Sequence, residues 1–134
     1  MNIISTLQHC KWPLAAVLLF QSGACGEDKA ADPSNDIVES WKKAGLDPIE
    51  LSEPSEDKAG SCVRGKVAKL HVELCTYSDA LAADSAKEAG LAKFGSATGA
   101  ALVRDRYLLL VSDVDRVDVH GKTLNTLAKT FLKP

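Results

Sequence analysis

Apolar residues recur near the C-terminal end at the spacing of one helix face. They are Leu124, Leu127, Ala128, Phe131 and Leu132. Residues three and four apart lie on one side of an α-helix, so this pattern predicts an amphipathic helix. Upstream, Tyr107 to Val111 is an unbroken apolar run, which is typical of a strand buried on both faces. A second strand is expected at 100–103, and the polar residues 104–106 predict a chain reversal between the two.

Apolar and polar residues alternate between Cys62 and Cys75, and this alternation predicts a β-hairpin. A turn at Ala68 and Lys69 pairs apolar residues on one face and polar residues on the other. The expected pairs are Val67 with Leu70, Gly65 with Val72, Val63 with Leu74, Lys66 with His71, Arg64 with Glu73, and Cys62 with Cys75. The cysteines then form a non-hydrogen-bonded pair with Cα atoms about 4.5 Å apart, which a disulfide can bridge. Ala-Lys lacks the Asn-Gly chemistry that favours such turns, so a bulged or longer loop is the alternative.

The segment before the hairpin predicts a helix and a short strand. The helix begins near Asp36 and ends at Gly45, with Leu46 as the hydrophobic residue of a glycine-capped end. Residues 49–51 alternate apolar with polar, as a short edge strand does, and 53–61 read as a charged loop.

After the hairpin, Ser78 or Asp79 can cap an alanine-rich helix that ends at about Lys93. The order of elements is therefore helix, strand, hairpin, helix, hairpin, helix. This order predicts an α+β fold of two layers, with an antiparallel sheet of about four to five strands and about three helices on one face. The polar face of the hairpin would be open to solvent, exposing Arg64, Lys66, His71 and Glu73.

The N-terminal segment has the features of an export signal. His9 and Lys11 precede an apolar stretch from Trp12 to Phe20, about nine residues, which is the length of a signal-peptide core. A membrane-spanning helix would need about 20 residues. We therefore expect the chain to be exported.

The motif Ser22-Gly23-Ala24-Cys25 resembles the lipobox of bacterial lipoprotein precursors, although that family usually has Leu at the position of Ser22. The resemblance implies cleavage before Cys25, acylation of Cys25 and attachment of the mature chain to a membrane by its acyl chains. Gly26 stands where an Asp often signals inner-membrane retention, so the resemblance favours the outer membrane. Cleavage by an ordinary secretory peptidase, giving a secreted or periplasmic protein, is the alternative.

These features divide the chain into three parts. Residues 1–24 are the predicted signal peptide, 25–35 a polar, flexible tether, and 36–134 a single α+β domain. The chain has 16 basic and 18 acidic residues and a formal net charge of -2, with no cluster of cations. This balance excludes an extended nucleic-acid surface.

The four cysteines have separate expected fates. Cys10 leaves with the signal peptide and Cys25 takes the lipid, so Cys62 and Cys75 remain as a pair in an oxidising compartment. Closing a loop of about 14 residues should contribute roughly 3 kcal/mol to stability.

We expect no metal site in the chain. Asp113, Asp115 and Asp118 are spaced like the ligands of a calcium loop. However, the fifth and twelfth positions of such a loop would be Val117 and Leu124, whose side chains cannot bind calcium. Solvation of the strand end and capping of the last helix explain these aspartates.

We expect no catalytic and no cofactor-binding residue either. His71 and Glu73 lie two apart on one strand face, and an acid–base pair needs a pocket that an open sheet face does not supply. His120 follows Ser112 and Asp113, but no Gly-x-Ser-x-Gly elbow or oxyanion loop accompanies them.

Two classes of function remain. The first is a noncatalytic module of the cell envelope, held to the membrane through lipid on Cys25, that binds an envelope protein or a small ligand. The second is a small secreted enzyme or enzyme inhibitor without a lipid anchor. A deep pocket that holds two or more titratable groups within hydrogen-bond reach would favour the enzyme.

Overall fold

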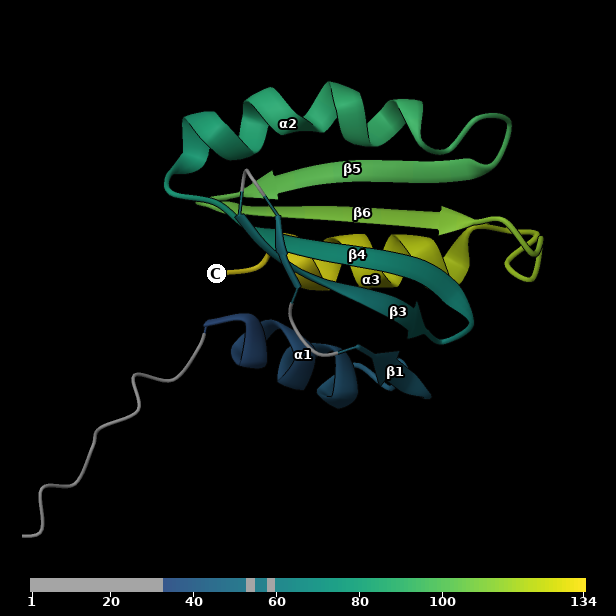
Figure 1. Ribbon diagram of the computed structural model, residues 1–134. Helices are drawn as coiled ribbons and strands as arrows, with labels where there is room; N and C mark the ends of the chain where they lie inside the picture. The colour runs from purple at the N-terminus through teal and green to yellow at the C-terminus, as the bar shows by residue number, and fades with distance from the viewer. Residues whose placement is uncertain (1–32, 53–54, 58–59) are drawn as a thin grey trace, which may run out of the picture.

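Three helices pack against one antiparallel sheet in the described part of the chain (Figure 1). The computed structural model describes residues 33–52, 55–57 and 60–134. The elements are α1 (Pro33–Lys43), β1 (Ile49–Leu51), β2 (Ser55–Asp57), β3 (Gly60–Val67), β4 (Leu70–Thr76), α2 (Ala80–Ala92), β5 (Thr98–Arg104), β6 (Tyr107–Asp113) and α3 (Lys122–Leu132). The predicted signal peptide and Cys25 lie outside the described residues. Among the helices that are described, none is both long and apolar enough to cross a bilayer.

The sheet has the strand order β1-β3-β4-β6-β5. β1 and β2 both pair with the outer edge of β3, one near each of its ends, so six strand segments occupy five positions. This arrangement confirms the predicted α+β class and an antiparallel sheet of four to five strands. β2 lies within residues 53–61, which we predicted to be a loop, because Ser55 to Asp57 pair with the beginning of β3.

The β3–β4 hairpin has the register predicted from the sequence at all six pairs. Ala68 and Lys69 form the turn, and both have positive φ values, 47° and 72°, as a type I′ turn requires. The predicted disulfide joins Cys62 to Cys75, whose Cα atoms are 4.1 Å apart. The pattern of apolar and polar residues therefore determines this hairpin, although its turn residues are unusual.

α1 and α3 cover one face of the sheet with large side chains. Trp41 of α1 and Leu127 and Phe131 of α3 are fully buried against the inward residues of β3, β4 and β6. α1 begins at Pro33, three residues before the predicted start, because proline suits the first turn of a helix. Its end has the predicted glycine cap, in which Gly45 has a φ of 75°. The Leu46 amide donates to the Trp41 carbonyl, and the Leu46 side chain is buried.

α2 lies on the opposite face of the sheet, where it packs against β5 and β6 (Figure 1). This differs from the prediction of three helices on one face. The residues that α2 turns inward are small: Ala83 is fully buried, and a Cβ atom on Gly90 would lie 2.5 Å from a Leu110 methyl group. Its leucines Leu81 and Leu91 point outward. The amphipathic stripe that selects a face is therefore absent from this helix.

β6 is the central strand under both helical layers. All seven of its residues are buried. The apolar run predicted burial of Tyr107 to Val111, and the burial extends to Ser112 and Asp113. Leu109 and Val111 point to α1 and α3, and Leu108 and Leu110 point to α2. On the α2 face, however, no helix of the described chain covers β3 and β4 (Figure 1). This uncovered area carries the polar residues of the hairpin.

Candidate functional site

A cavity of about 370 Å³ opens on the α2 face of the sheet, in the corner between the end of α2 and the β3–β4 hairpin. We call it the hairpin-face cavity. Its charged wall consists of Arg64, Lys66, His71, Glu73 and Lys93, and its floor is formed by Phe94, Leu110 and Ser112. Its volume lies within the range of about 300 to 1,000 Å³ that is usual for small-molecule sites.

The floor of the cavity is apolar except for one hydroxyl group. Leu110 is 4% exposed and Ser112 is 7% exposed. The Phe94 ring packs so close to Gly99 that a Cβ atom there would lie 2.8 Å from it, so Gly99 lets the ring lie against the sheet. Ser112 lies directly across from His71 on β4. Within the described residues, no hydrogen bond is formed by the Ser112 side chain.

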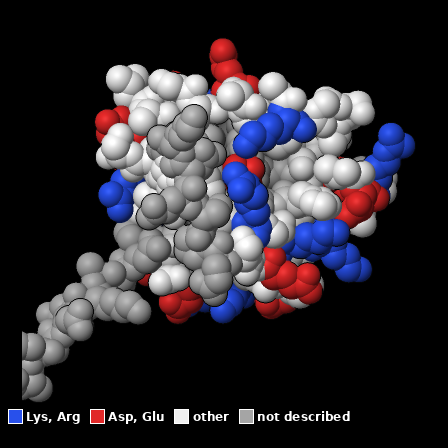
Figure 2. Space-filling model, viewed as in Figure 1, with Lys and Arg blue, Asp and Glu red and all other residues white. Residues whose placement is uncertain are grey.

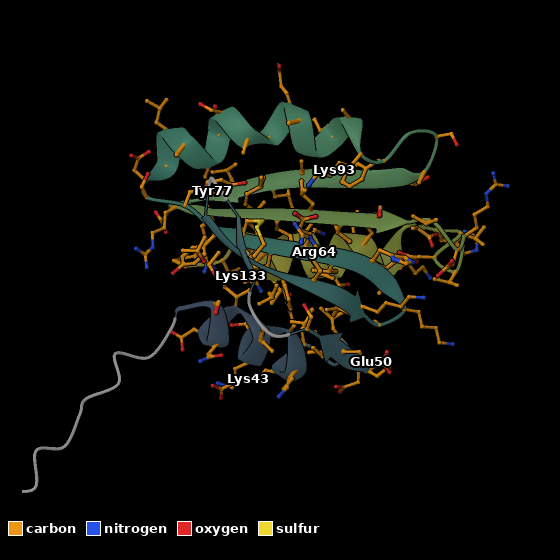
Figure 3. The ribbon with its side chains drawn as sticks, viewed as in Figure 1. Lys43, Glu50, Arg64, Tyr77, Lys93 and Lys133 are labelled. Carbon is orange, nitrogen blue, oxygen red and sulfur yellow. A yellow bond between two sulfur atoms is a disulfide. The ribbon has the colours of Figure 1, made fainter. Side chains whose placement is uncertain are left out.

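Glu73 is the carboxylate in the wall of the cavity, and it bridges two cations. Its Oε1 accepts a hydrogen bond from Arg64 Nη2 at 3.1 Å, and Lys93 Nζ donates to both of its oxygens, at 3.2 and 3.4 Å. Figure 3 shows Arg64 and Lys93 approaching each other over the sheet. Burial of Glu73 raises the pKa of its carboxyl group, but hydrogen bonds and charge from Arg64 and Lys93 outweigh this, and the pKa falls below its usual value.

Asp115 forms a second ion cluster at the edge of the cavity. Its Oδ2 accepts a hydrogen bond from Lys66 Nζ at 2.9 Å and lies 3.1 Å from His71 Nε2. The Lys66 hydrogen bond and then the His71 hydrogen bond lower the pKa of the Asp115 carboxyl group. Asp115 belongs to the loop after β6, so these contacts also hold that loop against the hairpin.

The polar hairpin face is not the open surface that we predicted. Arg64 pairs with Glu73 as the register implied, but His71 contacts Asp115 and not Glu73. The end of α2 adds a second wall, which turns this part of the face into a cavity. Figure 2 presents this side of the molecule, on which basic and acidic side chains alternate. The cavity holds several titratable groups within hydrogen-bond reach, which is the feature we associated with an enzyme.

Ser112, His71 and Asp115 have the composition of a hydrolytic triad, but the serine–histidine hydrogen bond is not formed among the described residues. Ser112, His71 and Asp115 meet at the cavity, whereas His120, which we considered as a partner for Ser112, is exposed. A working triad requires the serine hydroxyl to be hydrogen bonded to the imidazole. Among the described residues, that bond is not formed. Both carboxylates at the cavity are held ionised by cations, so neither is poised as a general acid near neutral pH.

The aspartates that resembled a calcium loop are used by the loop itself. Asp113 accepts hydrogen bonds from the amides of Val117 and Asp118, and Asp118 accepts one from the amide of Leu124 at 2.8 Å. Burial alone would raise the pKa of the Asp118 carboxyl group. Backbone hydrogen bonds from the first turn of α3 have the larger effect, and the pKa falls below its usual value. Asp118 therefore contacts the first turn of the last helix, as predicted. Asp113 is buried and bonds to the loop, so it is not the solvated strand end that we expected.

One group of side chains has the composition of a metal site, but its sulfur atoms are not available. Ligand atoms of Cys62, Glu73 and Cys75 lie within 4.8 Å of one another. The two sulfur atoms are bonded to each other, whereas a metal-binding cysteine needs a thiolate. The Glu73 carboxylate is bound to Arg64 and Lys93. This group is therefore a structural cluster beside the cavity.

The predicted register identified half of the cavity. It placed Arg64, Lys66, His71 and Glu73 on one hairpin face, and the structure confirms that placement. It did not identify Lys93, Phe94, Leu110 or Ser112, which come from other elements and carry no motif. Lys93 reaches Glu73 from 20 positions away because the end of α2 packs on β6, which is the neighbour of β4 in the sheet. Comparison with protein-family models, with curated proteins and with solved structures finds no match to this chain.

Proposed function

We propose that the chain is a membrane-tethered lipoprotein of the bacterial cell envelope, anchored through Cys25, whose folded domain is a noncatalytic binding module. The outer membrane is the favoured location. The hairpin-face cavity is the observation that carries the binding role, because it combines a charged wall with an apolar floor in one partly enclosed space. The export features and the lipobox resemblance of residues 1–25 support the tether.

The position of the cavity also suits a tethered module. The start of α1 lies near one end of the sheet, at the left of Figure 1. Lys66, His71 and Ser112 belong to the opposite end, where the β3–β4 turn lies and β6 ends. A tether that leads into α1 would therefore leave the cavity accessible to a partner.

The ion pairs favour binding over proton transfer. Glu73 and Asp115 each contact two bases, and the pKa of each carboxyl group is lowered by them. Groups held in this way supply a fixed pattern of charge to a bound partner, whereas a general acid or base needs a pKa near the working pH. The cavity is thus better suited to recognition than to catalysis.

The tether is tested by mass spectrometry of membrane fractions. We expect the mature chain to begin at an acylated Cys25 and a Cys25→Ala chain to lose this modification. A mature chain that begins at Cys25 without lipid would overturn the tether. A photo-crosslinking amino acid introduced at position 66 should form a defined adduct in intact cells, whereas one at position 42, on the exposed side of α1, should not. Equal adducts at both positions, or none at 66, would overturn binding at the cavity.

A small secreted enzyme is the second candidate, and the meeting of Ser112, His71 and Asp115 is the observation that favours it. A fluorophosphonate probe labels activated serine hydroxyls, so the enzyme hypothesis expects labelling that is lost in Ser112→Ala and retained in Ser85→Ala. If the folded protein is not labelled, the enzyme hypothesis is contradicted and the binding module remains the preferred function.

A further inference from the structure

We propose that the hairpin-face cavity binds a small organic anion with an apolar body, such as a carboxylate or phosphate monoester on a short hydrocarbon group. This proposal rests on the proposed binding role of the cavity and names the chemical class of its ligand. Three features of the cavity support this proposal. Cations outnumber carboxylates on its wall, its floor is mostly apolar, and the Ser112 hydroxyl group lies at its base.

The charge on the wall favours an anion. Three permanent cations, Arg64, Lys66 and Lys93, line the cavity together with one carboxylate, Glu73. Asp115, outside the lining, is shared by Lys66 and His71. Among the described residues, Glu50 has a strand position that pairs with that of Lys66, but it is exposed and does not line the cavity. The lining thus holds more cationic than anionic side chains, and a negative ligand could accept charge-assisted hydrogen bonds from Lys66 and Lys93.

The floor requires an apolar body on that anion. Leu110 and Phe94 form most of it, and burying their surface is favourable at roughly 25 cal/mol per Å². An inorganic ion would leave this surface wet. A hydrocarbon group placed on the floor, with its charged group toward Lys66 and Lys93, would contact both the apolar and the charged part of the cavity.

Ser112 gives the cavity a fixed polar point at its base. The residue is 93% buried, since it is 7% exposed, and it lines the cavity from β6. Its side chain makes no hydrogen bond to the other described residues, and its hydroxyl oxygen is not among their solvent-shielded unpaired atoms, so it can be reached from the cavity. An oxygen of the anionic group can accept this hydroxyl hydrogen. The hydroxyl group therefore points to a ligand that brings a hydrogen-bond acceptor.

The experiment titrates the full mature protein with 3-phenylpropanoate, 3-phenylpropylamine and 3-phenylpropan-1-ol, which share an apolar body and differ in charge. Amide chemical shifts report the site of binding. We expect 3-phenylpropanoate to bind saturably and to shift the amide signals of Phe94, Leu110 and Ser112. The alcohol should bind about 10-fold more weakly, because it cannot form a charge-assisted hydrogen bond. The amine should not bind saturably. Inorganic phosphate should bind more weakly than 3-phenylpropyl phosphate, because it lacks the apolar body.

Substitutions with matched controls measure how much Ser112 and Lys66 each contribute to binding of 3-phenylpropanoate. Ser112→Ala should weaken 3-phenylpropanoate binding about 2- to 10-fold, and Ser85→Ala, on the exposed side of α2, should not. Lys66→Gln should weaken it about 2- to 5-fold, and Lys129→Gln on α3 should not. Lys66 is half-exposed, so this variant keeps the test valid if Ser112→Ala alters the fold.

Several outcomes would overturn the anion proposal: equal binding of the amine, no saturable binding of the carboxylate or the phosphate monoester, shifts confined to other surfaces, or no effect of either cavity variant. If position 66 forms its adduct in cells while these anions fail to bind, the ligand class is wrong and the binding module stands. If the anions bind but position 66 forms no adduct in cells and Cys25 is not acylated, the proposed ligand class stands and the proposed tethered module is wrong.

Discussion

The two faces of the sheet are closed in different ways. On one face, α1 and α3 bring large side chains, and Trp41, Leu127 and Phe131 have no exposed surface. On the other, α2 brings Ala83 and Gly90 and lies directly over β5 and β6. Within the described chain, no helix covers β3 and β4 on the α2 face. The disulfide there is buried in the smaller apolar cluster, and the ion pairs of Glu73 with Arg64 and Lys93 lie beside it.

The difference explains why the cavity forms on the α2 face. Large apolar side chains from two helices fill the space above a sheet, since packing in protein interiors leaves few voids. A single helix with small inward residues approaches closely but covers a narrow band of strands. Beyond its end, the sheet face remains accessible, and polar residues of β3 and β4 can face a ligand. The face covered by α1 and α3, which we call the sealed face, holds the larger apolar core, and the partly covered face holds the cavity.

Removal of a large side chain from the sealed face should have the greatest effect on stability. Phe131→Ala deletes a fully buried ring, so we expect the free energy of unfolding to fall by about 3 to 5 kcal/mol in urea denaturation. Leu132→Ala, on the same helix but half-exposed, is the control and should cost about 1 kcal/mol or less. Similar costs for both variants would show that α3 does not seal this face.

The disulfide should make the next largest contribution, on the α2 face. Reduction of the wild-type protein, or the double substitution Cys62→Ala/Cys75→Ala, should lower the free energy of unfolding by about 3 kcal/mol, because the loop it closes is no longer constrained in the unfolded chain. Reductant should not change the stability of the double variant. A wild-type protein whose stability is insensitive to reductant would contradict this role.

Enlarging a small residue should disturb the α2 face without affecting the sealed face. Gly90→Val introduces atoms into the contact with Leu110, and such overpacking costs about 1 to 3 kcal/mol. Ala89→Val, an exposed neighbour, measures the change in helix propensity alone and should cost less than about 0.7 kcal/mol. Urea denaturation compares the two. A neutral Gly90→Val would mean that close approach of α2 is not required.

The smallest effect should come from the ion cluster of the uncovered strands and should depend on pH. The pKa of Glu73 is lowered in the folded protein, so its contribution is present above the unfolded pKa and is lost as the pH falls through the folded pKa. Near neutral pH, Glu73→Gln should reduce the free energy of unfolding by about 0.2 to 1 kcal/mol. Wild type and variant should converge in acid.

Glu88→Gln, an exposed position on α2, is the control for this measurement and should follow the wild-type pH dependence. Urea midpoints between neutral and acidic pH report both variants. If Glu73→Gln follows the wild-type curve throughout, the pairs with Arg64 and Lys93 do not contribute to stability.

The β3–β4 hairpin and the C-terminal helix could be read from the sequence because their patterns are local and periodic. A shift of one residue in the hairpin would move every apolar side chain to the wrong face and separate Cys62 from Cys75, so a single register satisfies both constraints. In α3, Leu127 and Phe131 are four apart and are both fully buried.

The position of α2 and the composition of the cavity were decided by the tertiary structure. Alanine occurs on both sides of α2, and Leu81 and Leu91 face solvent, so hydrophobicity alone does not select the face against which it packs. Once α2 lies over β5 and β6, Lys93 meets Glu73, Phe94 meets the sheet, and Ser112 becomes the base of a cavity. Periodicity determines what lies on each face of an element, whereas contacts between elements depend on how the layers are stacked.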